Sequence, residues 1–497
     1  MKTDLLADRH IGIQEADLPA MLEKIGVKSL DELINKTIPS KIRLKEPLAL
    51  AAPMTEREFA EHIAGLASLN KIYTSYIGMG WYDTITPAVI QRNVFENPAW
   101  YTSYTPYQTE VSQGRLEALL NFQTVISDLT AMPLANCSLL DEATAAAEAA
   151  TMMYGLRSRD QQKKGTNVLF VDESIFPQNL AVIQTRVIPQ GMKIQVGNYK
   201  ELEFTPEIFA CIIQYPNASG SVEDYREFVE KAHAANCKVA VDADILSLAL
   251  LLPPGEWGAD IVFGSTQRLG IPLFYGGPSA AYFATRDEYK RNMPGRIIGL
   301  SKDKYGKICY RMALQTREQH IKREKATSNI CTAQALLATM AGFYAVYHGQ
   351  EGIKNIAKRI HSIATWLNKA LARLGYVQHN EIFFDTLRFS LPDHVSAQKL
   401  RTIALSKEVN LCYYDNGDVG FSIDETTDLK DVNLLLSIFS IAAEETMQEV
   451  TDIPEASSLN RDLRRRTSFL THEVFNKYHT ETEMMRYIKR LERKHIS

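Results

Sequence analysis

The sequence contains few cysteines, and none of them lie close together. Their spacing gives no Cys-x-x-Cys pair and no Cys/His cluster of the kind that builds a zinc site, so we expect reduced, mostly buried thiols. The six are Cys137, Cys211, Cys237, Cys309, Cys331 and Cys412.

Long apolar segments are also missing. No stretch approaches the roughly 18 uninterrupted apolar residues that a membrane-spanning helix needs, and the N-terminus lacks the continuous apolar core of a signal peptide. The net charge of -4 is small and spread along the chain, which argues against nucleic acid or an anionic membrane as a partner. We therefore predict a cytoplasmic protein with no nucleic-acid and no membrane partner.

The 497 residues have an ordinary globular composition, 45% hydrophobic and 23% charged, and leave room for two or three domains. Residues 1–70 are predicted to form a peripheral helical arm. Within this arm, Phe59, Ile63 and Leu66 follow at helical spacing after Thr55, which is a candidate N-cap.

Short apolar runs that alternate with helical segments begin near residue 165. The runs are Asn167–Val171, Phe209–Gln214, Lys238–Val241, Ala259–Phe263 and Ala280–Phe283. Continuous β-branched and aromatic runs joined by helices are typical of a mainly parallel sheet that is covered on both faces. The pattern predicts a large α/β domain over residues 71–325, with one long helix over 108–130 and another that starts near Asp141.

A small α+β domain is predicted over residues 326–451. Two long helices, over 329–347 and 353–374, come before a strand over 384–389, and Asn416-Gly417 marks a later hairpin turn. Residues 452–497 are predicted to be a linker and the start of a further unit. The linker contains Arg464, Arg465 and Arg466, which we interpret as a solvated turn.

One more absence concerns chemistry. The strand over 238–241 leads into Asp242, whereas the strand over 259–263 leads through Ser265 to Gln267 and Arg268. In a pyridoxal 5'-phosphate (PLP) site an acidic residue pairs with the pyridinium nitrogen, and a lysine after a later strand holds the aldehyde as an imine. Arginine cannot replace that lysine, because it stays protonated and has no free amine. The chain therefore has the layout of the non-catalytic half of a PLP enzyme.

The order of the two domains and the 23 residues between Asp242 and Ser265 are the pattern of fold type I PLP-dependent transferases. Residues at the corresponding places are interpreted as a degenerate remnant of a cofactor site; they are Ser138, Thr144, Asp242, Ser265 and Gln267. The alternative is that Asp242 is a hydrogen-bond acceptor at a strand end and Ser138 a helix cap.

Four longer segments, in the same order, resemble the N-terminal half of the glycine cleavage system P-protein. They are Tyr104–Gly114, Asn136–Ala145, Gly264–Arg268 with Tyr275–Pro278, and Arg317–Asn329. The resemblance covers the chain from Arg9 to its end. Members of this family occur as one long chain with two homologous halves or as two subunits, and the Schiff-base lysine belongs to the C-terminal half. Residues 469–494 resemble the opening of that half, so we expect a truncated long chain or a natural fragment.

The resemblance implies a fold type I protein with a mainly parallel seven-stranded-type sheet, and PLP-dependent decarboxylation of glycine with transfer of the aminomethyl group to the lipoyl arm of H-protein. This chain would be inactive alone, and PLP would be bound mainly by the lysine-bearing half or subunit. In fold type I dimers each active site borrows residues across the interface, and the resemblance places Tyr104, Tyr107, Gln108, Ser112 and Gln113 in such a substrate and interface pocket. Core packing and helix capping are the alternative for this segment.

Two other functions stay open at this point. The chain could be a structural or regulatory paralogue that binds partner proteins and no cofactor. It could also be an independent PLP lyase that uses Lys290 or Lys302, although neither lysine follows the Asp242 strand at the expected place. When isolated, the chain is expected to form a homodimer, because the surface that meets the other half should be large and apolar.

Overall fold

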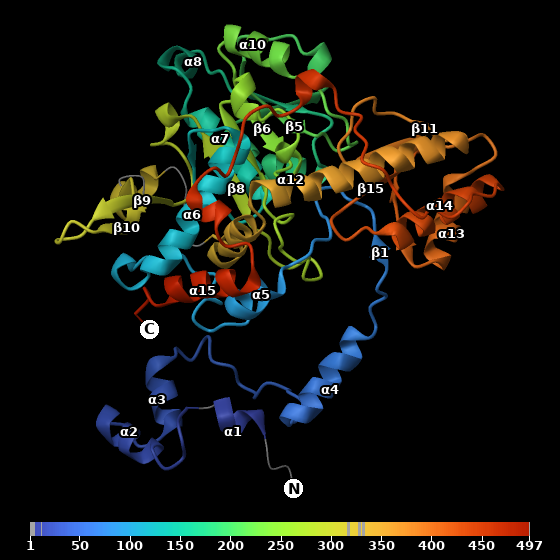
Figure 1. Ribbon diagram of the computed structural model, residues 1–497. Coiled ribbons are helices and arrows are strands. Elements are labelled where there is room, and N and C mark those ends of the chain that lie inside the picture. The colour runs from blue at the N-terminus through green and yellow to red at the C-terminus, as the bar shows by residue number, and fades with distance from the viewer. Residues whose placement is uncertain (1–4, 11, 316–318, 327–329, 331–332, 497) are drawn as a thin grey trace. The chain divides into compact units, whose positions relative to one another are not determined.

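The computed structural model describes residues 5–10, 12–315, 319–326, 330 and 333–496. The chain divides into two compact units, residues 1–73 and residues 74–497, which Figure 1 draws from blue to red along the chain. The domain boundaries predicted near residues 325 and 451 lie inside the second unit and stay predictions.

The first unit is helical in the part that the structure describes. Its helices are α1 (Leu6–His10), α2 (Leu18–Ile25), α3 (Leu30–Thr37) and α4 (Glu56–Ala67). The hydroxyl of Thr55 accepts a hydrogen bond from the backbone N–H of Glu58, and the carboxylate of Glu58 accepts one from the backbone N–H of Thr55. These reciprocal bonds satisfy two N–H groups that have no partner inside α4, and they confirm the predicted N-cap.

A seven-stranded sheet lies at the centre of the second unit, with the strand order β2-β8-β7-β6-β5-β3-β4 in the described part of the chain (Figure 1). The strands are β2 (Leu134–Ala135), β3 (Val168–Asp172), β4 (Lys193–Gly197), β5 (Ile208–Tyr215), β6 (Lys238–Ala243), β7 (Ile261–Ser265) and β8 (Ala281–Thr285). Strands β3 to β7 pair in parallel, and β8 is antiparallel to both β7 and β2. The five predicted strands and the mainly parallel sheet are confirmed.

Successive strand residues enter two different hydrophobic cores. On β5, Cys211 belongs to the cluster that contains residues of α6 and α12, whereas Ile212 belongs to the cluster that contains residues of α7 and α9. The α-helices in the described part of this unit, in chain order, are α5 (Ala88–Ile90), α6 (Gln113–Thr130), α7 (Glu142–Gly155), α8 (Arg159–Lys163), α9 (Pro177–Val187), α10 (Arg226–Ala234), α11 (Gln319–Lys322), α12 (Ala335–Arg373), α13 (Ala397–Ser406), α14 (Leu429–Ala443) and α15 (Glu481–Glu492). Burial on both faces explains why the strands are continuous apolar runs.

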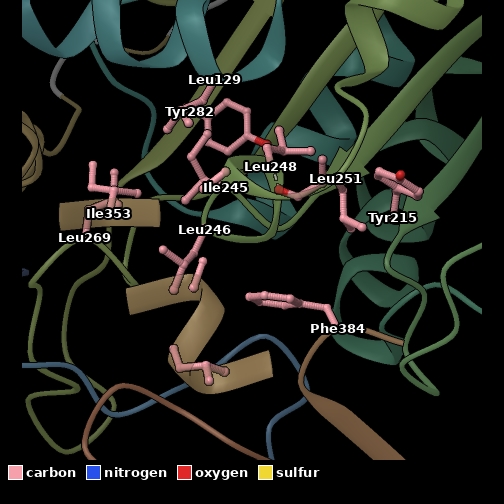
Figure 2. Close-up of a cluster of buried hydrophobic side chains, with 14 of the residues drawn as sticks. Leu129, Tyr215, Ile245, Leu246, Leu248, Leu251, Leu269, Tyr282, Ile353 and Phe384 are labelled. Atoms are coloured by element: carbon pink, nitrogen blue, oxygen red, sulfur yellow. Dashed lines mark hydrogen bonds between the residues drawn. The ribbon is translucent and has the colours of Figure 1, made fainter. Parts of the chain in front are cut away.

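The first of these cores is dense where the chain leaves β6. Figure 2 shows Ile245, Leu246 and Leu248 beside Ile353 of α12 and Phe384. Each of these side chains is at most 1% exposed. Side chains packed this closely fix the backbone that follows Asp242.

Two helix predictions need correction. Helix α6 begins at Gln113 and not at Gln108, because the intervening residues form a separate short turn and Ser112 has a non-helical φ of -131°. The two helices predicted after residue 329 form the single element α12, which is interrupted at Gly349 (φ 62°, ψ -174°). A Cβ at Gly349 would lie 2.7 Å from the carbonyl oxygen of Phe475, so this kink requires glycine.

The small α+β region has a four-stranded sheet in the order β11-β12-β15-β14 in the part that the structure describes. Its strands are β11 (Val377–Gln378), β12 (Thr386–Ser390), β14 (Cys412–Tyr413) and β15 (Val419–Ser422), and a separate pair joins β1 (Thr74–Ser75) to β13 (Val409–Asn410). Antiparallel pairing of β14 with β15 around Gly417 confirms the predicted hairpin. A second hairpin, β9 (Ile297–Lys302) with β10 (Ile308–Ala313), stands apart from both larger sheets.

The C-terminal residues pack on the large sheet's helices. Helix α15 buries Met484, Tyr487, Ile488 and Leu491, and the side-chain amide of Asn121 on α6 donates a hydrogen bond of 2.7 Å to the hydroxyl of Tyr487. An amphipathic helix is stabilised mainly by such burial of its apolar face.

The three arginines before this helix differ from one another. Arg464 and Arg466 are exposed, as predicted for a solvated turn, whereas Arg465 is half-buried. The guanidinium of Arg465 donates hydrogen bonds to the carbonyl oxygens of Asp128 (2.6 Å), Leu129 (2.7 Å) and Leu248 (2.9 Å), and burial lowers its pKa to about 10. The solvated-turn prediction is therefore wrong for Arg465, which binds carbonyls at the C-terminal end of α6.

We expect Arg465→Ala to lower the free energy of unfolding by about 2–4 kcal/mol, because it leaves several half-buried carbonyls without a donor. The measurement is urea denaturation at pH 7. Arg466→Ala is the matched control, since Arg466 makes only an exposed ion pair with Asp462, and it should change the free energy by less than about 1 kcal/mol. Equal effects of the two substitutions would contradict this role of Arg465.

Candidate functional site

A small cavity lies where β6 and β7 end, at the place where the sequence predicts the remnant of a cofactor site. Only about 30 Å³ of it is open to the centres of water molecules, which is room for a few waters. Its lining comes from both sheets of the second unit: Met79, Gly80, Tyr82, Glu142, Phe176, Gln214, Pro216, Asn217, Ala218, Asp242, Asp244, Ser265, Arg268, Asp385 and Thr386.

Asp242 is buried at the end of β6, with 1% of its surface exposed. Its Oδ2 accepts a hydrogen bond of 2.7 Å from the side-chain amide of Asn179 on α9. Burial raises the pKa of Asp242 to about 7, although hydrogen bonds from Glu142 and Asn179 act in the opposite direction. The acidic residue of the predicted site is therefore present, but its neighbours are protein side chains.

Glu142, in the first turn of α7, lines the same cavity as Asp242. Burial, and next the charge of Asp242, raise the pKa of Glu142 well above its usual range. Two buried carboxyls in contact cannot both ionise at low cost. Oδ2 of Asp242 is bound by Asn179, whereas its Oδ1 is buried with no hydrogen-bond partner among the described residues.

Arg268 follows β7 with Gln267, in the segment where the sequence predicts that the lysine of a PLP site is missing, and it is 5% exposed. Its Nη1 donates to Oδ2 of Asp244 at 2.6 Å and also to Oδ2 of Asp385. The guanidinium carbon lies 3.8 Å from the centre of the Tyr82 ring. Burial acts against the charge of Arg268, but the two carboxylates raise its pKa above the ordinary value. Burial raises the pKa of Asp385, against the attraction of Arg268.

Gln267, the residue before Arg268, fixes the loop that covers the cavity. Its side-chain amide donates to the carbonyls of Tyr82 (2.6 Å) and Ile271 (2.7 Å) and accepts from the backbone N–H of Tyr82 at 3.2 Å. The amide is 1% exposed and has these backbone partners on both sides. Gln267 therefore positions Tyr82 over Arg268.

The remaining remnant residues have local roles. Ser265 lines the cavity and its hydroxyl accepts from the backbone N–H of Gln267. Thr144 forms a reciprocal cap with Asp141 at the start of α7, and the hydroxyl of Ser138 donates to the carbonyl of Leu139. The cap of α7 is Asp141, so Ser138 is not the helix cap of the alternative interpretation. Among the described residues, neither Ser138 nor Thr144 is in the cavity lining.

These residues do not fit PLP. The N-terminus of α7, where a phosphate would be favoured by the helix dipole, already carries the acidic Asp141 and Glu142. Glu142 contacts Asp242, and Arg268 has no amine that could condense with an aldehyde. The described cavity lining contains no lysine; Lys290 pairs with Asp287 at 2.7 Å and Lys302 lies at the end of β9.

The Tyr104–Gln113 segment divides into two groups. Tyr104 (72% exposed), Tyr107 (45% exposed) and Gln108 are on the surface, and the hydroxyl of Tyr107 lies 3.4 Å from a guanidinium nitrogen of Arg296. These three residues are not in the described lining of the cavity.

The other two residues of the segment are less exposed. Ser112 is buried at the start of α6, where its side chain makes no capping hydrogen bond. The side-chain amide of Gln113 accepts from the backbone N–H of Tyr310 (2.9 Å) and donates to the carbonyls of Tyr310 (2.8 Å) and Thr109 (2.7 Å). Gln113 thus holds β10 and has its donors in use.

Sequence reasoning missed three groups that determine the site, namely Glu142, Asp385 and Tyr82. Glu142 was visible only as an acid in the first turn of a helix. Asp385 lies 117 residues from Arg268, and nothing in the local pattern connects them. No metal-binding group of three or more His, Cys, Asp or Glu side chains occurs in the described residues, and no described helix is long and apolar enough to cross a membrane.

The sheet, the small second domain and the filled cavity define a chain of the fold type I PLP-dependent class that lacks the covalent anchor for the cofactor. The family model described as Glycine cleavage system P-protein matches residues 8–439. The chain therefore belongs to the glycine cleavage system P-protein family, and the resemblance noted in the sequence is confirmed.

Curated relatives agree with this assignment. A protein of Bacteroides thetaiotaomicron named Glycine dehydrogenase (decarboxylating) is 78% identical over 497 residues, which is 100% of this chain and 52% of that protein. A protein of Flavobacterium johnsoniae with the same name is 55% identical over the same length, again 52% of that protein. The chain thus spans about half the length of the curated relatives that it matches.

Solved structures agree as well. A crystal structure of glycine decarboxylase (P-protein) of the glycine cleavage system, in inhibitor-bound form, is similar with a TM-score of 0.78 and 30% identity, over 86% of this chain and 99% of that chain. Glutamate decarboxylase of Lactobacillus brevis is similar in fold alone, with a TM-score of 0.59 and 12% identity over 82% of this chain and 96% of that one. The fold class is confirmed.

Removal of the positive charge at Arg268 should destabilise the protein. Arg268→Met leaves Asp244 and Asp385 buried without a cation, and we expect a loss of about 3–5 kcal/mol in the free energy of unfolding at pH 7. The loss should be smaller at pH 5, because burial raises the pKa of Asp385 and this carboxyl can take up a proton there once the cation is removed. Lys231→Met, which removes an exposed pair with Glu227, is the control and should cost less than about 1 kcal/mol. A loss at Arg268 that does not depend on pH would contradict this explanation.

The Glu142–Asp242 pair should make stability decrease as the pH rises. The folded chain keeps protons that the unfolded chain releases above about pH 4, so the contribution of the pair is largest below that pH and declines toward about pH 7. Asp242→Asn removes this titration, and the decrease between pH 5 and pH 7 should become smaller by on the order of 1 kcal/mol per pH unit. Urea denaturation across this range is the measurement. The exposed Asp160→Asn should keep the wild-type dependence, and a shared slope would exclude the buried pair as its cause.

Proposed function

We propose that this chain is the lysine-free half of a glycine decarboxylase and completes the active site of a lysine-bearing half. The observation that carries the proposal is that the segment after β7 has Gln267 and Arg268 and no lysine, and that Arg268 is fixed by the carboxylates of Asp244 and Asp385. A half with this filled cavity cannot hold the cofactor covalently. PLP, which supplies the electron sink for decarboxylation, is bound by the lysine-bearing half in this proposal.

The lengths of the relatives also support a protein made of this half and a lysine-bearing half. The relatives named Glycine dehydrogenase (decarboxylating) carry about as much chain again beyond the part that matches. The reaction proposed for the assembled protein is decarboxylation of glycine with aminomethyl transfer to the lipoyl arm of H-protein. Glycine and H-protein are therefore proposed partners, and a cytoplasmic location and homodimerisation of the isolated chain stay predictions.

Tyr104, Tyr107 and Gln108 are proposed to complete the pocket of the other half. Their polar groups reach the surface, unlike the amide of Gln113, and the ring of Tyr107 has the guanidinium carbon of Arg296 5.4 Å from its centre. Phenol and amide groups in this position can orient the carboxylate of glycine or the lipoyl arm by hydrogen bonds. Ser112 and Gln113 lie at the start of α6, and in this proposal they fix the end of the Tyr104–Gln108 segment.

The test uses an exchange assay between glycine and labelled bicarbonate. The chain alone, with PLP and lipoylated H-protein, should show no exchange, whereas its mixture with the complementary half of the Bacteroides thetaiotaomicron relative should be active. In that mixture Tyr107→Phe and Gln108→Ala should lower glycine turnover by about tenfold or more, the loss expected for one or two positioning hydrogen bonds. Tyr101→Phe, at another exposed tyrosine of the same segment, is the control and should keep full turnover.

Three results would contradict parts of the proposal. Exchange by the pure chain would show that another group replaces the lysine. A folded mixture without exchange would favour the structural or regulatory paralogue. Full turnover of the Tyr107 and Gln108 variants, together with a lower melting temperature, would place the segment in core packing and capping.

A further inference from the structure

The β9–β10 hairpin projects from the body of the second unit (Figure 1). Its strands are antiparallel, with Met312 opposite Ile298, Tyr310 opposite Leu300 and Ile308 opposite Lys302. Because side chains alternate along a strand, the apolar members of these pairs share one face. The other face carries Gly299, Ser301, Cys309 and Arg311 over the same length.

Only the inner end of the apolar face is covered. Ile298 (2% exposed) and Met312 (6% exposed) belong to the core that also contains residues of α6. Farther along the same face, Leu300 is 63% exposed and Ile308 is 70% exposed. We call Leu300 and Ile308 the outer hairpin face. A strand with one apolar face is normally covered along its whole length, and this one is covered along only half of it.

Two glutamines of α6 hold the hairpin in this position. The side-chain amide of Gln113 pairs with both backbone groups of Tyr310, and the amide of Gln123 pairs with both backbone groups of Ile298, at 2.7 and 3.1 Å. One glutamine therefore closes the outer edge of β10 and the other closes that of β9. Glutamine amides on both edges fix the hairpin on α6 and occupy edge groups that could otherwise pair with another strand.

The surroundings of the outer hairpin face limit what can cover it. The tip and rim carry Lys302, Lys304, Lys307 and Arg311 against one acid, Asp303, and all five are exposed. The backbone N–H of Ile496 donates to the carbonyl of Val111, and the ammonium of Lys494 lies 6.0 Å from the centre of the Tyr310 ring.

We propose that the outer hairpin face docks on the lysine-bearing half of the protein, on an apolar patch with an acidic rim. This inference rests on the proposed function and deepens it, since it names the element that joins the halves. Two features support this occupant: the continuity of the apolar face beyond the core, and the excess of positive charge at its rim. Relatives with about twice the length of this chain have the additional polypeptide that such a patch needs.

The experiment measures the Kd between this chain and the complementary half of the Bacteroides thetaiotaomicron relative by isothermal titration calorimetry. The double variant Leu300→Lys, Ile308→Lys should bind at least about a hundredfold more weakly, because two apolar side chains lose their cover and each new ammonium faces desolvation. Val196→Lys is the matched control. Val196 is also a partly exposed strand residue (44%), but it lies on β4, an end strand of the seven-stranded sheet, and not on the hairpin. Its variant should bind within about twofold of the wild type.

The outcomes separate this proposal from the one on which it rests. No binding by the wild-type chain would overturn both proposals. Binding that is equal for the wild type and the double variant would overturn the hairpin proposal alone. A melting temperature of the isolated double variant several degrees below that of the wild type would also overturn it, because the face would then be covered within this chain. So would a homodimer of the wild type that the double substitution dissociates without changing the Kd for the other half, because a second copy would then cover the face.

Discussion

The ion pairs of Arg268 determine how the other groups around the cavity are arranged. A guanidinium does not lose its proton in a protein, so a buried arginine must have anions within reach. Asp244 directly follows β6, and Asp385 directly precedes β12. The same guanidinium therefore connects the large sheet to the small one, and Tyr82 covers it with its ring. A lysine can become neutral and reactive when it is buried, whereas the guanidinium of Arg268 stays charged and cannot form an imine.

The neighbouring carboxyls complete the charge balance in another way. Among the described residues, no ion pair joins Glu142 or Asp242 to a cation, and burial raises the pKa values of both carboxyls. Asn179 binds the remaining side of Asp242. Protein side chains thus satisfy part of the site, whereas Oδ1 of Asp242 and Nη2 of Arg268 are buried without a hydrogen-bond partner among the described residues. The hydrophobic cluster in Figure 2 holds the backbone behind them.

The sequence was sufficient for the parts of the fold that depend on local patterns. Continuous apolar runs gave the five strands, Asn416-Gly417 gave the hairpin, and the replacement of lysine by Gln267-Arg268 was visible because both flank a strand. Contacts between distant residues could not be predicted in this way. Asp385 as the partner of Arg268, Glu142 as the partner of Asp242 and Arg465 at the end of α6 all depend on how the elements pack. Gln113 was assigned to a pocket by resemblance, and no local pattern could show that its amide holds β10.

The residues proposed to act in the assembled protein lie on the surface of this chain, near α6. Arg296 comes directly before β9, and its guanidinium lies over the ring of Tyr107. The clamps at Gln113 and Gln123 fix β10 and β9 on the same helix whose start follows the Tyr104–Gln108 segment. In the proposed assembly, the contact that joins the halves and the side chains that complete the pocket are therefore attached to one support, α6. Docking of the hairpin would bring Tyr107 and Gln108 to the pocket of the other half without any further movement. The conformational entropy of these residues is already lost when this half folds, so association does not cost it again.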